Sequence, residues 1–291
     1  MVLDIALPFH GDVDLFKDSV RSVLFQDSSE WRLIIINDAH PDLDVDKWVH
    51  GLNDTRITYI RNDTNLGPSK NYSKCLELVQ NEYCMIFGAD DLLAKNFVSE
   101  ISNAIKASPD SDLYHPCVNV IDAKSVEYLP QVDRIKKFLM PKSKGLGQFT
   151  ARQVIPSIMT GNWMYFPAIV WKSETAKKFG FRHDLNVCQD IWLISEILIA
   201  GGKLTIVPED VFNYRRFSGS DSSIKLLNGI RFKEEKKAFY GIAKNLSRNK
   251  MYFSAFAARL HLTSRLHALS LIPQALIKRA SIKPILVHLF S

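Results

Sequence analysis

The chain has 291 residues, of which 46% are hydrophobic and 23% are charged. This length and composition suit an ordinary globular protein and exclude collagen-like, low-complexity and wholly disordered chains. No run of about 18 uncharged apolar residues occurs, and no basic segment follows Met1, so neither a membrane-spanning helix nor a secretory signal is expected. The four cysteines lack CxxC and metal-ligand spacing, which indicates reduced thiols in a cytoplasmic protein.

The net charge of +6 is unevenly distributed. Residues 225–291 contain 13 Lys and Arg but only two acids, whereas residues 1–224 contain 24 basic and 29 acidic side chains. Such asymmetry favours an anionic partner for the C-terminal segment, either a membrane surface or nucleic acid. The alternative is a solvated basic face on helices that pack on the main domain, and charge alone does not choose among these.

The first 120 residues alternate short apolar segments with amphipathic ones. Strands are predicted at 3–7, 31–36, 57–60, 83–87 and 112–120, and helices at 12–26, 68–79 and 95–106. Continuous apolar strands separated by helices indicate a parallel sheet that is covered on both faces. Ligands of such sheets bind at the carboxyl ends of the strands, where polar clusters follow at 8–10, 37–38 and 88–91.

The pattern changes in the second half of the chain. Residues 122–148 are polar and irregular, and they end in a stretch typical of a flexible loop. Helices are predicted at 150–159 and 189–200, strands at 165–171 and 203–207, and a polar loop at 213–223. The remainder is predicted to be helical, at about 228–246, 250–270 and 272–290, so an α/β domain is followed by a helical extension.

Two of the polar clusters suggest chemistry that is ambiguous when each is taken alone. Asp90 and Asp91 follow a buried strand and offer the oxygen ligands that Mg²⁺ and Mn²⁺ prefer, but adjacent aspartates also cap helices. Asp38 could accept hydrogen bonds from a nucleotide, or it could start a turn. The motifs GxGxxG and GxxxxGK[ST] are absent, which removes the main support for a dinucleotide-binding or P-loop protein.

Five short motifs occur in a fixed order. They are IALPFH at 5–10, SVLFQ at 22–26, ND at 37–38, NLGPSKN at 65–71 and GADD at 88–91. In this order and at this spacing they resemble the glycosyltransferase family 2 group with the GT-A fold, over about residues 3–223. The resemblance implies a GT-A domain at 1–223, with a nucleotide-sugar half at 1–120 and an acceptor half at 121–223. The basic helical extension then occupies 224–291.

The resemblance also implies a donor site and a metal site. The residues expected to contact a nucleotide-diphosphate sugar are Pro8, Phe9, Asp38, Asn65, Gly67, Lys70, Asp90, Arg215 and Arg216. Asp90 and Asp91 are expected to bind Mn²⁺ or Mg²⁺. The chain departs from the family pattern at Asn37, which replaces the first acid of a strand-end pair, and at Gly88, which replaces the first Asp of D-x-D.

In the second half, Gln189-Asp190 resembles the acid-Asp pair of the family, which implies that Asp190 deprotonates the acceptor hydroxyl. Gln189 departs from that pattern. The stretch YRRFSGSDS at 214–222 resembles the closing Y-R-x-H-x-x-S-x-S loop, with Phe217 in place of a His that often holds the metal or the diphosphate. The Q-x-x-R-W signature of processive synthases is absent, which favours transfer of a single sugar.

These observations predict an inverting, metal-assisted glycosyltransferase that acts on a cell-envelope glycan or a lipid-linked acceptor. A cation would stabilise the departing diphosphate, and one carboxylate within about 3 Å would accept the proton of the acceptor hydroxyl. A second hypothesis, motivated by Gly88, Gln189 and Phe217, is a catalytically impaired nucleotide-sugar-binding or scaffold protein. A nucleic-acid partner is not expected, because no RNA- or DNA-binding motif is present.

Residues 250–290 combine many apolar side chains with basic ones and contain no acid. Helices of this composition lie in membrane interfaces, where basic residues meet anionic headgroups. We therefore predict a peripheral location on the inner face of the cell membrane. The alternative is that these helices pack on the catalytic domain or on a second copy of the chain.

Overall fold

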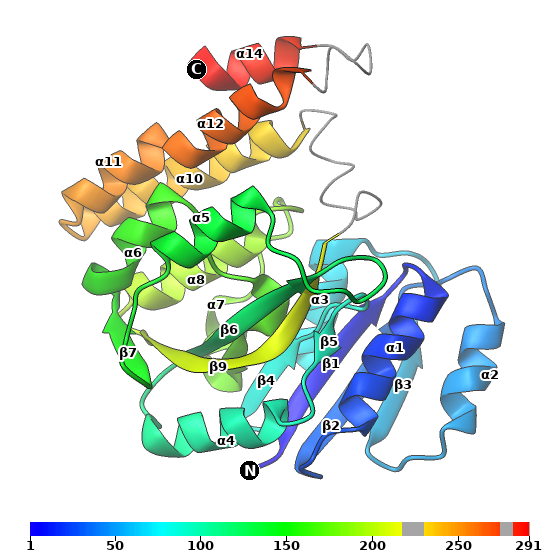
Figure 1. Ribbon diagram of the computed structural model, residues 1–291. Helices are drawn as coiled ribbons and strands as arrows, with labels where there is room; N and C mark the ends of the chain where they lie inside the picture. Colours follow the sequence, from blue (N-terminus) through cyan, green and yellow to red (C-terminus); the bar gives the residue numbers. More distant parts are fainter. Residues whose placement is uncertain (217–229, 274–281, 291) are drawn as a thin grey trace.

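The structure is a computed structural model that describes residues 1–216, 230–273 and 282–290. A nine-stranded sheet in the order β3-β2-β1-β4-β8-β6-β9-β5, with β7 beside β9, forms its centre (Figure 1). The strands are β1 (Leu3–Phe9), β2 (Trp31–Asn37), β3 (Ile57–Arg61), β4 (Tyr83–Ile86), β5 (Leu92–Leu93), β6 (Leu113–Ile121), β7 (Gly147–Thr150), β8 (Val170–Lys172) and β9 (Lys203–Arg215). Strands β5, β7 and β8 run antiparallel to their neighbours, and the other pairs are parallel. The expected α/β fold with a mostly parallel sheet is confirmed.

Helices cover both faces of this sheet. They are α1 (Val13–Leu24), α2 (Asp44–Gly51), α3 (Pro68–Leu78), α4 (Phe97–Ala107), α5 (Gln131–Leu139), α6 (Ala151–Thr160), α7 (Ser173–Phe179), α8 (Gln189–Ile199), α10 (Ile230–Arg248), α11 (Tyr252–Leu260), α12 (Leu262–Ser270) and α14 (Lys283–Phe290), with a 3-10 turn at Phe166–Ala168. In Figure 1 the helices α10, α11, α12 and α14 lie together at one end of the molecule, above α5, α6 and α8.

The alternation of side chains along the strands creates two cores, one on each face. In β1 the side chains of Leu3, Ile5 and Leu7 belong to one cluster with α1, α2 and α4, whereas Ala6 points to the other face. This is the two-residue period of a strand, applied to a sheet that is buried on both sides. The strands that the polar clusters follow are therefore anchored by buried side chains on both faces.

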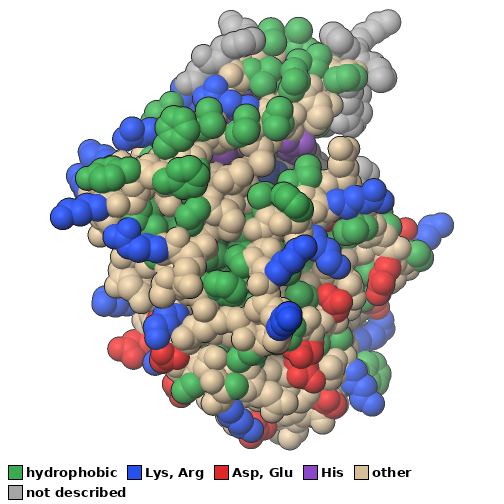
Figure 2. Space-filling model, turned by 60° about the vertical axis from the view of Figure 1, so that its left-hand side comes forward, with side chains coloured by type: hydrophobic (Ala, Val, Ile, Leu, Met, Phe, Trp, Pro, Cys, Tyr) green, Lys and Arg blue, Asp and Glu red, His purple; other side chains and the backbone are tan. Residues whose placement is uncertain are grey.

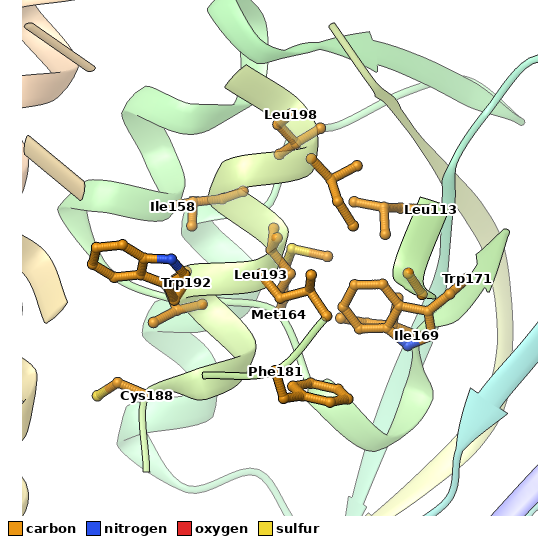
Figure 3. Close-up of a cluster of buried hydrophobic side chains, with 14 of the residues drawn as sticks. Leu113, Ile158, Met164, Ile169, Trp171, Phe181, Cys188, Trp192, Leu193 and Leu198 are labelled. Carbon is orange, nitrogen blue, oxygen red and sulfur yellow. The ribbon is translucent and has the colours of Figure 1, made fainter. Parts of the chain in front are cut away.

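The second core surrounds α8 and includes part of the C-terminal extension. Figure 3 shows α8 side chains such as Trp192, Leu193 and Leu198 packed among residues of the neighbouring helices and strands. Helices α10 and α11 contribute to this same cluster. The contact is close: a Cβ added at Gly241 of α10 would lie 2.5 Å from Cζ3 of Trp192, so only glycine permits this approach. Helix α10 is thus docked directly on α8.

Several predicted elements were wrong or incomplete. The supposed irregular segment contains α5 and β7, and α2 was not predicted. Strand β9 continues to Arg215, where a loop was expected, and the predicted helix at 250–270 is broken at His261, which has a φ of 43°. The 223/224 domain boundary, Phe217 and most of the 214–222 motif lie outside the described residues.

Candidate active site

A cleft of ≈ 1050 Å³ opens at the carboxyl ends of β1, β2 and β4 and extends to α5, α8 and the C-terminal helices. Nine of the predicted site residues line it: Pro8, Phe9, Asp38, Asn65, Gly67, Asp90, Asp91, Asp190 and Arg216. Lys70 and Arg215 do not line it. Lys70 is exposed on α3, outside this lining, and its contact with the donor stays a prediction. The structure therefore brings together residues that are far apart in the sequence.

We call the part of the cleft at the ends of β1, β2 and β4 the donor side, because the predicted donor residues lie there. On this side, Asp38 organises the loop that precedes α3. Its carboxylate accepts hydrogen bonds from the backbone N–H of Leu66 at 2.9 Å and of Gly67 at 3.1 Å, and from the side chain of Asn62 at 2.7 Å. Gly67 has a φ of +76°, a conformation that side chains with a Cβ rarely adopt. Asp38 and Gly67 together fix the edge of the cleft that carries Asn65.

Phe9 forms an aromatic wall of the donor side. It is 1% exposed and stacks on Phe16, with ring centroids 4.1 Å apart, and on His40 at 4.9 Å. The ring is therefore packed inside the wall of the cleft and fixes the end of β1 beside the Asp38 carboxylate. The Asp38 carboxylate supplies the hydrogen-bond acceptor at this edge.

Hydrogen bonds from Arg215 fix the turn that carries Asp90 and Asp91. The backbone N–H of Arg215 donates to Asp91 Oδ1 at 2.8 Å, and its Nε donates to the carbonyl of Asp90 at 2.7 Å. A further guanidinium nitrogen donates to the carbonyl of Asp122 at 2.8 Å, and the residue is only 2% exposed. Contrary to the prediction, Arg215 is not a donor aimed at the ligand, because its guanidinium is used to fix this turn.

The carboxylates of Asp90 and Asp91 converge beside Gly88. A Cβ added at Gly88 would lie 3.3 Å from Asp90 Oδ1 and 3.1 Å from Cγ of Asp91. Burial raises the pKa of both carboxyl groups, and the charge of Asp90 raises the pKa of Asp91 further. A divalent cation would relieve this repulsion, and the oxygen donors fit Mg²⁺ or Mn²⁺. The residues present therefore fit the expected metal.

Asp190 lies in the first turn of α8 and lines the cleft. Burial raises its pKa to about 6, although the nearby charges of Lys136 and Arg231 act in the opposite direction. A carboxylate with a pKa near the working pH can both accept a proton and release it afterwards. Its position in the cleft and its raised pKa are compatible with the general-base role that the sequence predicts.

The start of α8 is held by a residue of the C-terminal extension. Glu234 of α10 accepts hydrogen bonds from the backbone N–H groups of Asn186 and Cys188, both at 2.8 Å, and of Val187 between them. On the next turn, Lys237 forms an ion pair with Asp184 at 2.7 Å. The segment that leads into Asp190 is therefore fixed by α10 and not by its own helix alone.

Sequence reasoning missed the contribution of α5. Lys136 lies 3.8 Å from the ring centroid of Tyr165, and burial lowers its pKa to about 7, with the charge of Arg216 as a further cause. Asp133 accepts hydrogen bonds from the hydroxyl of Tyr165 at 2.7 Å and from Arg216 at 2.8 Å. The apolar residues Val132, Ile135 and Phe138 recur at near-helical spacing, and this was the signal that could have revealed α5.

The model of the family described as "Glycosyl transferase family 2" matches residues 4–173. The chain belongs to this family, as the five motifs predicted. It is 37% identical over 91 residues to the putative colanic acid biosynthesis glycosyl transferase WcaA of Escherichia coli. It is also 26% identical over 115 residues to the abequosyltransferase RfbV of Salmonella typhimurium. The matches cover 31% and 38% of this chain, and only 32% and 34% of the relatives.

Solved structures confirm the GT-A fold. The first 349 residues of S. aureus TarS superpose with a TM-score of 0.70 at 14% identity, covering 94% of this chain and 75% of that one. The mannosyltransferase PcManGT from Pyrobaculum calidifontis, in complex with GDP-Man and Mn²⁺, gives a TM-score of 0.61 at 15% identity, covering 99% and 85%. Within the described residues, no helix has the length and apolar character needed to cross a membrane.

Proposed function

We propose that the protein is an inverting glycosyltransferase that moves one sugar from a nucleotide-diphosphate sugar to a hydroxyl of a cell-envelope glycan or lipid-linked acceptor. The observation that carries this proposal is the shared cleft: the Asp90–Asp91 pair and the carboxylate of Asp190, whose pKa burial raises to about 6, line the same cavity. One side suits a diphosphate with its cation, and the other suits an acceptor that must lose a proton.

The donor is held by the strand ends. Asp38 and the end of β1 at Phe9 lie where the nucleoside would bind, and Asn65 and Gly67 form the edge beside it. A Mn²⁺ or Mg²⁺ ion on Asp90 and Asp91 would neutralise charge that develops on the leaving diphosphate. Arg216 supplies a further cation in the cleft, because Asp133 engages only one of its guanidinium nitrogens.

Asp190 accepts the proton of the acceptor hydroxyl as the oxygen attacks the anomeric carbon. The bond from that carbon to the diphosphate breaks and its electron pair leaves with the phosphate, while the new bond forms on the opposite face of the sugar. A single base and one in-line displacement invert the configuration at the anomeric carbon. This scheme needs no second catalytic carboxylate of the kind used by most glycoside hydrolases.

The acceptor class is supported by the relatives. The names of WcaA and RfbV refer to colanic acid biosynthesis and to abequose transfer, and the two relatives match 31% and 38% of this chain. The absence of Q-x-x-R-W agrees with transfer of one sugar at a time. The envelope acceptor is inferred from these names and from the surface of the extension described below.

The experiment is a screen of nucleotide-diphosphate sugars with the full chain in Mn²⁺, scored by thermal shift and by release of the nucleoside diphosphate. We expect one nucleotide class to stabilise the protein, and its release to require Asp190. Stabilisation without turnover on any acceptor fraction would instead support the impaired-binding hypothesis. The absence of any stabilisation would contradict both.

We further propose that the extension attaches the enzyme to an anionic membrane surface. Large apolar side chains are exposed on its helices: Tyr252, Phe253, Phe256, Leu260, Leu262, Leu266, Leu269, Leu286 and Val287. Figure 2 shows apolar and basic side chains together over the upper part of the molecule, with acidic ones lower down on this face. Each basic residue near an anionic surface contributes about 1 kcal/mol.

Flotation with liposomes tests this attachment. We expect binding to anionic vesicles that is weakened by salt and reduced by the double substitution Phe253→Ser and Phe256→Ser. The matched control is Phe25→Ser, because Phe25 is 72% exposed in the donor half and Phe253 is 73% exposed. Lack of flotation combined with a concentration-dependent dimer would assign the apolar face to a second copy of the chain.

A further inference from the structure

Three segments of the extension bring an acidic side chain and two histidines together. Glu235 comes from α10, His261 from the junction of α11 and α12, and His288 from α14. One ligand atom of each lies within 4.8 Å of the other two. Glu235 and His288 are 7% and 6% exposed, so this is an interior cluster and not a chance grouping on the surface.

The backbone at His261 is unusual. It has φ 43° and ψ 47°, the left-handed conformation in which glycine is the favoured residue. The bend between α11 and α12 turns the imidazole onto the ring of Phe239, with centroids 3.7 Å apart. Non-glycine residues in this region cost about 1 kcal/mol or more and concentrate at functional sites. The bend places His261 between Phe239 of α10 and His288 of α14, whose ring centroid lies 6.2 Å away.

The ligand chemistry is suitable for a transition metal. Burial lowers the pKa of His261 to about 4 and also lowers that of His288, so both rings are neutral and keep a lone pair at neutral pH. Two imidazole nitrogens and one carboxylate oxygen form a common Zn²⁺ ligand set, with water as the fourth ligand. Both histidines, but not Glu235, line a cavity of ≈ 10 Å³, which is about the space of one water.

The surrounding charges limit the affinity but leave the ligands accessible. Arg231 donates to Glu235 Oε1 at 2.7 Å, and the hydroxyl of Ser264 donates to Oε2 at 2.6 Å and lies 2.9 Å from His288 Nε2. Each carboxylate oxygen has two lone pairs, so Glu235 can keep these partners and still bind a cation. Arg265 donates to the carbonyl of Leu289 at 2.8 Å, and with Lys236 and Arg259 it also borders the cavity beside the two histidines.

We propose that Glu235, His261 and His288 form a binding site for one Zn²⁺ ion, separate from the divalent cation at Asp90 and Asp91. The ion would tie α14 and the α11–α12 bend to α10. Because α10 also carries Glu234, which holds the segment before Asp190, this tie would stabilise the helix that positions the base. Glu235 and His261 line the far end of the same cleft.

Titration of the full, metal-free chain with Co²⁺ and Zn²⁺ tests the proposal. We expect about one equivalent of Co²⁺ to give the visible absorption of a low-coordinate site, to be displaced by Zn²⁺, and to raise the melting temperature. His288→Gln and His261→Ala should lose this absorption. Asp91→Asn should retain it, and so should His183→Ala, in which the histidine removed is an exposed one.

His288→Gln keeps a hydrogen-bonding group near Ser264, and circular dichroism of the metal-free form would check that it folds like the wild type. Wild-type protein that binds less than one equivalent of either metal would overturn the proposal. Equal absorption and equal thermal stabilisation in His288→Gln and the wild type would do the same. Neither result depends on the transferase activity.

Discussion

The two sides of the cleft are built in different ways. The donor side consists of residues that follow β1, β2 and β4, so the regular spacing of a parallel sheet places them side by side. The base side is assembled from α5, α8 and α10, which are remote from one another in the sequence. Short motifs therefore describe the first side well, whereas the second depends on contacts that no local pattern contains.

The two sides also differ in charge. The donor side places two buried carboxylates beside each other, an arrangement that favours the binding of a cation. The base side surrounds one carboxylate, Asp190, with the cations Lys136 and Arg231, which oppose the effect of burial on its pKa. The difference predicts that substitutions on the first side mainly affect donor and metal binding, and that those on the second mainly affect the transfer step.

The largest effect is expected for Asp190→Asn. Loss of a positioned general base lowers the rate of transfer by about 10²- to 10⁴-fold, while donor affinity remains nearly unchanged. Folding should not suffer: the pKa of Asp190 is raised from 3.8 to about 6, so above pH 6 its charge destabilises the folded state and asparagine removes that cost. Steady-state kinetics measure the rate of transfer, calorimetric titration measures the affinity for the nucleotide, and thermal melting measures the stability of the fold. A variant with near wild-type turnover would contradict the assignment.

Asp91→Asn tests the donor side. Removal of one metal-binding carboxylate should reduce the Mn²⁺-dependent affinity for the nucleotide diphosphate by about 10- to 100-fold. Calorimetry with and without Mn²⁺ measures this directly. If Mn²⁺ increases nucleotide affinity equally in the variant and the wild type, the metal lies elsewhere in the cleft.

Glu234→Ala tests whether α10 positions the base. The substitution leaves three backbone N–H groups without their acceptor, so we expect about 1–3 kcal/mol of lost stability and a kcat lowered about tenfold. The KM for the donor should not change, and Glu234→Gln should restore part of the rate. Lys237→Ala is the matched control, since it removes only an exposed ion pair from the same helix. An equal loss of kcat in both variants would refute a specific role for Glu234.

The fold and the donor side were largely predictable because their signals are local. Apolar strands, a helix with proline at its first turn, and polar residues after strand ends occur within a few residues of one another. Arg215 was misjudged because the sequence placed it in a polar loop, and a local pattern gives no information on the carbonyls that engage its guanidinium. Asp133 and Lys136 were missed because α5 buries polar residues and exposes apolar ones, which reverses the usual pattern.

A smaller effect is expected for Lys136→Met. The charge of Lys136 lowers the pKa of Asp190, so its removal should raise that pKa and move the acid side of the pH–rate profile to higher pH. At pH 6 we expect a rate reduced by roughly two- to threefold, with recovery at higher pH. Recovery at pH 8 separates this electrostatic effect from a structural one, which would lower the rate at every pH.

The most direct test of the account is the pH dependence of kcat/KM in the wild type and in Asp190→Asn. Because Asp190 must be ionised to accept a proton and its pKa is about 6, the wild-type value should fall about tenfold per pH unit below that point and level off above it. The variant should be slow and show no such dependence. A variant that keeps the same acid limb as the wild type would contradict the assignment of Asp190 as the base.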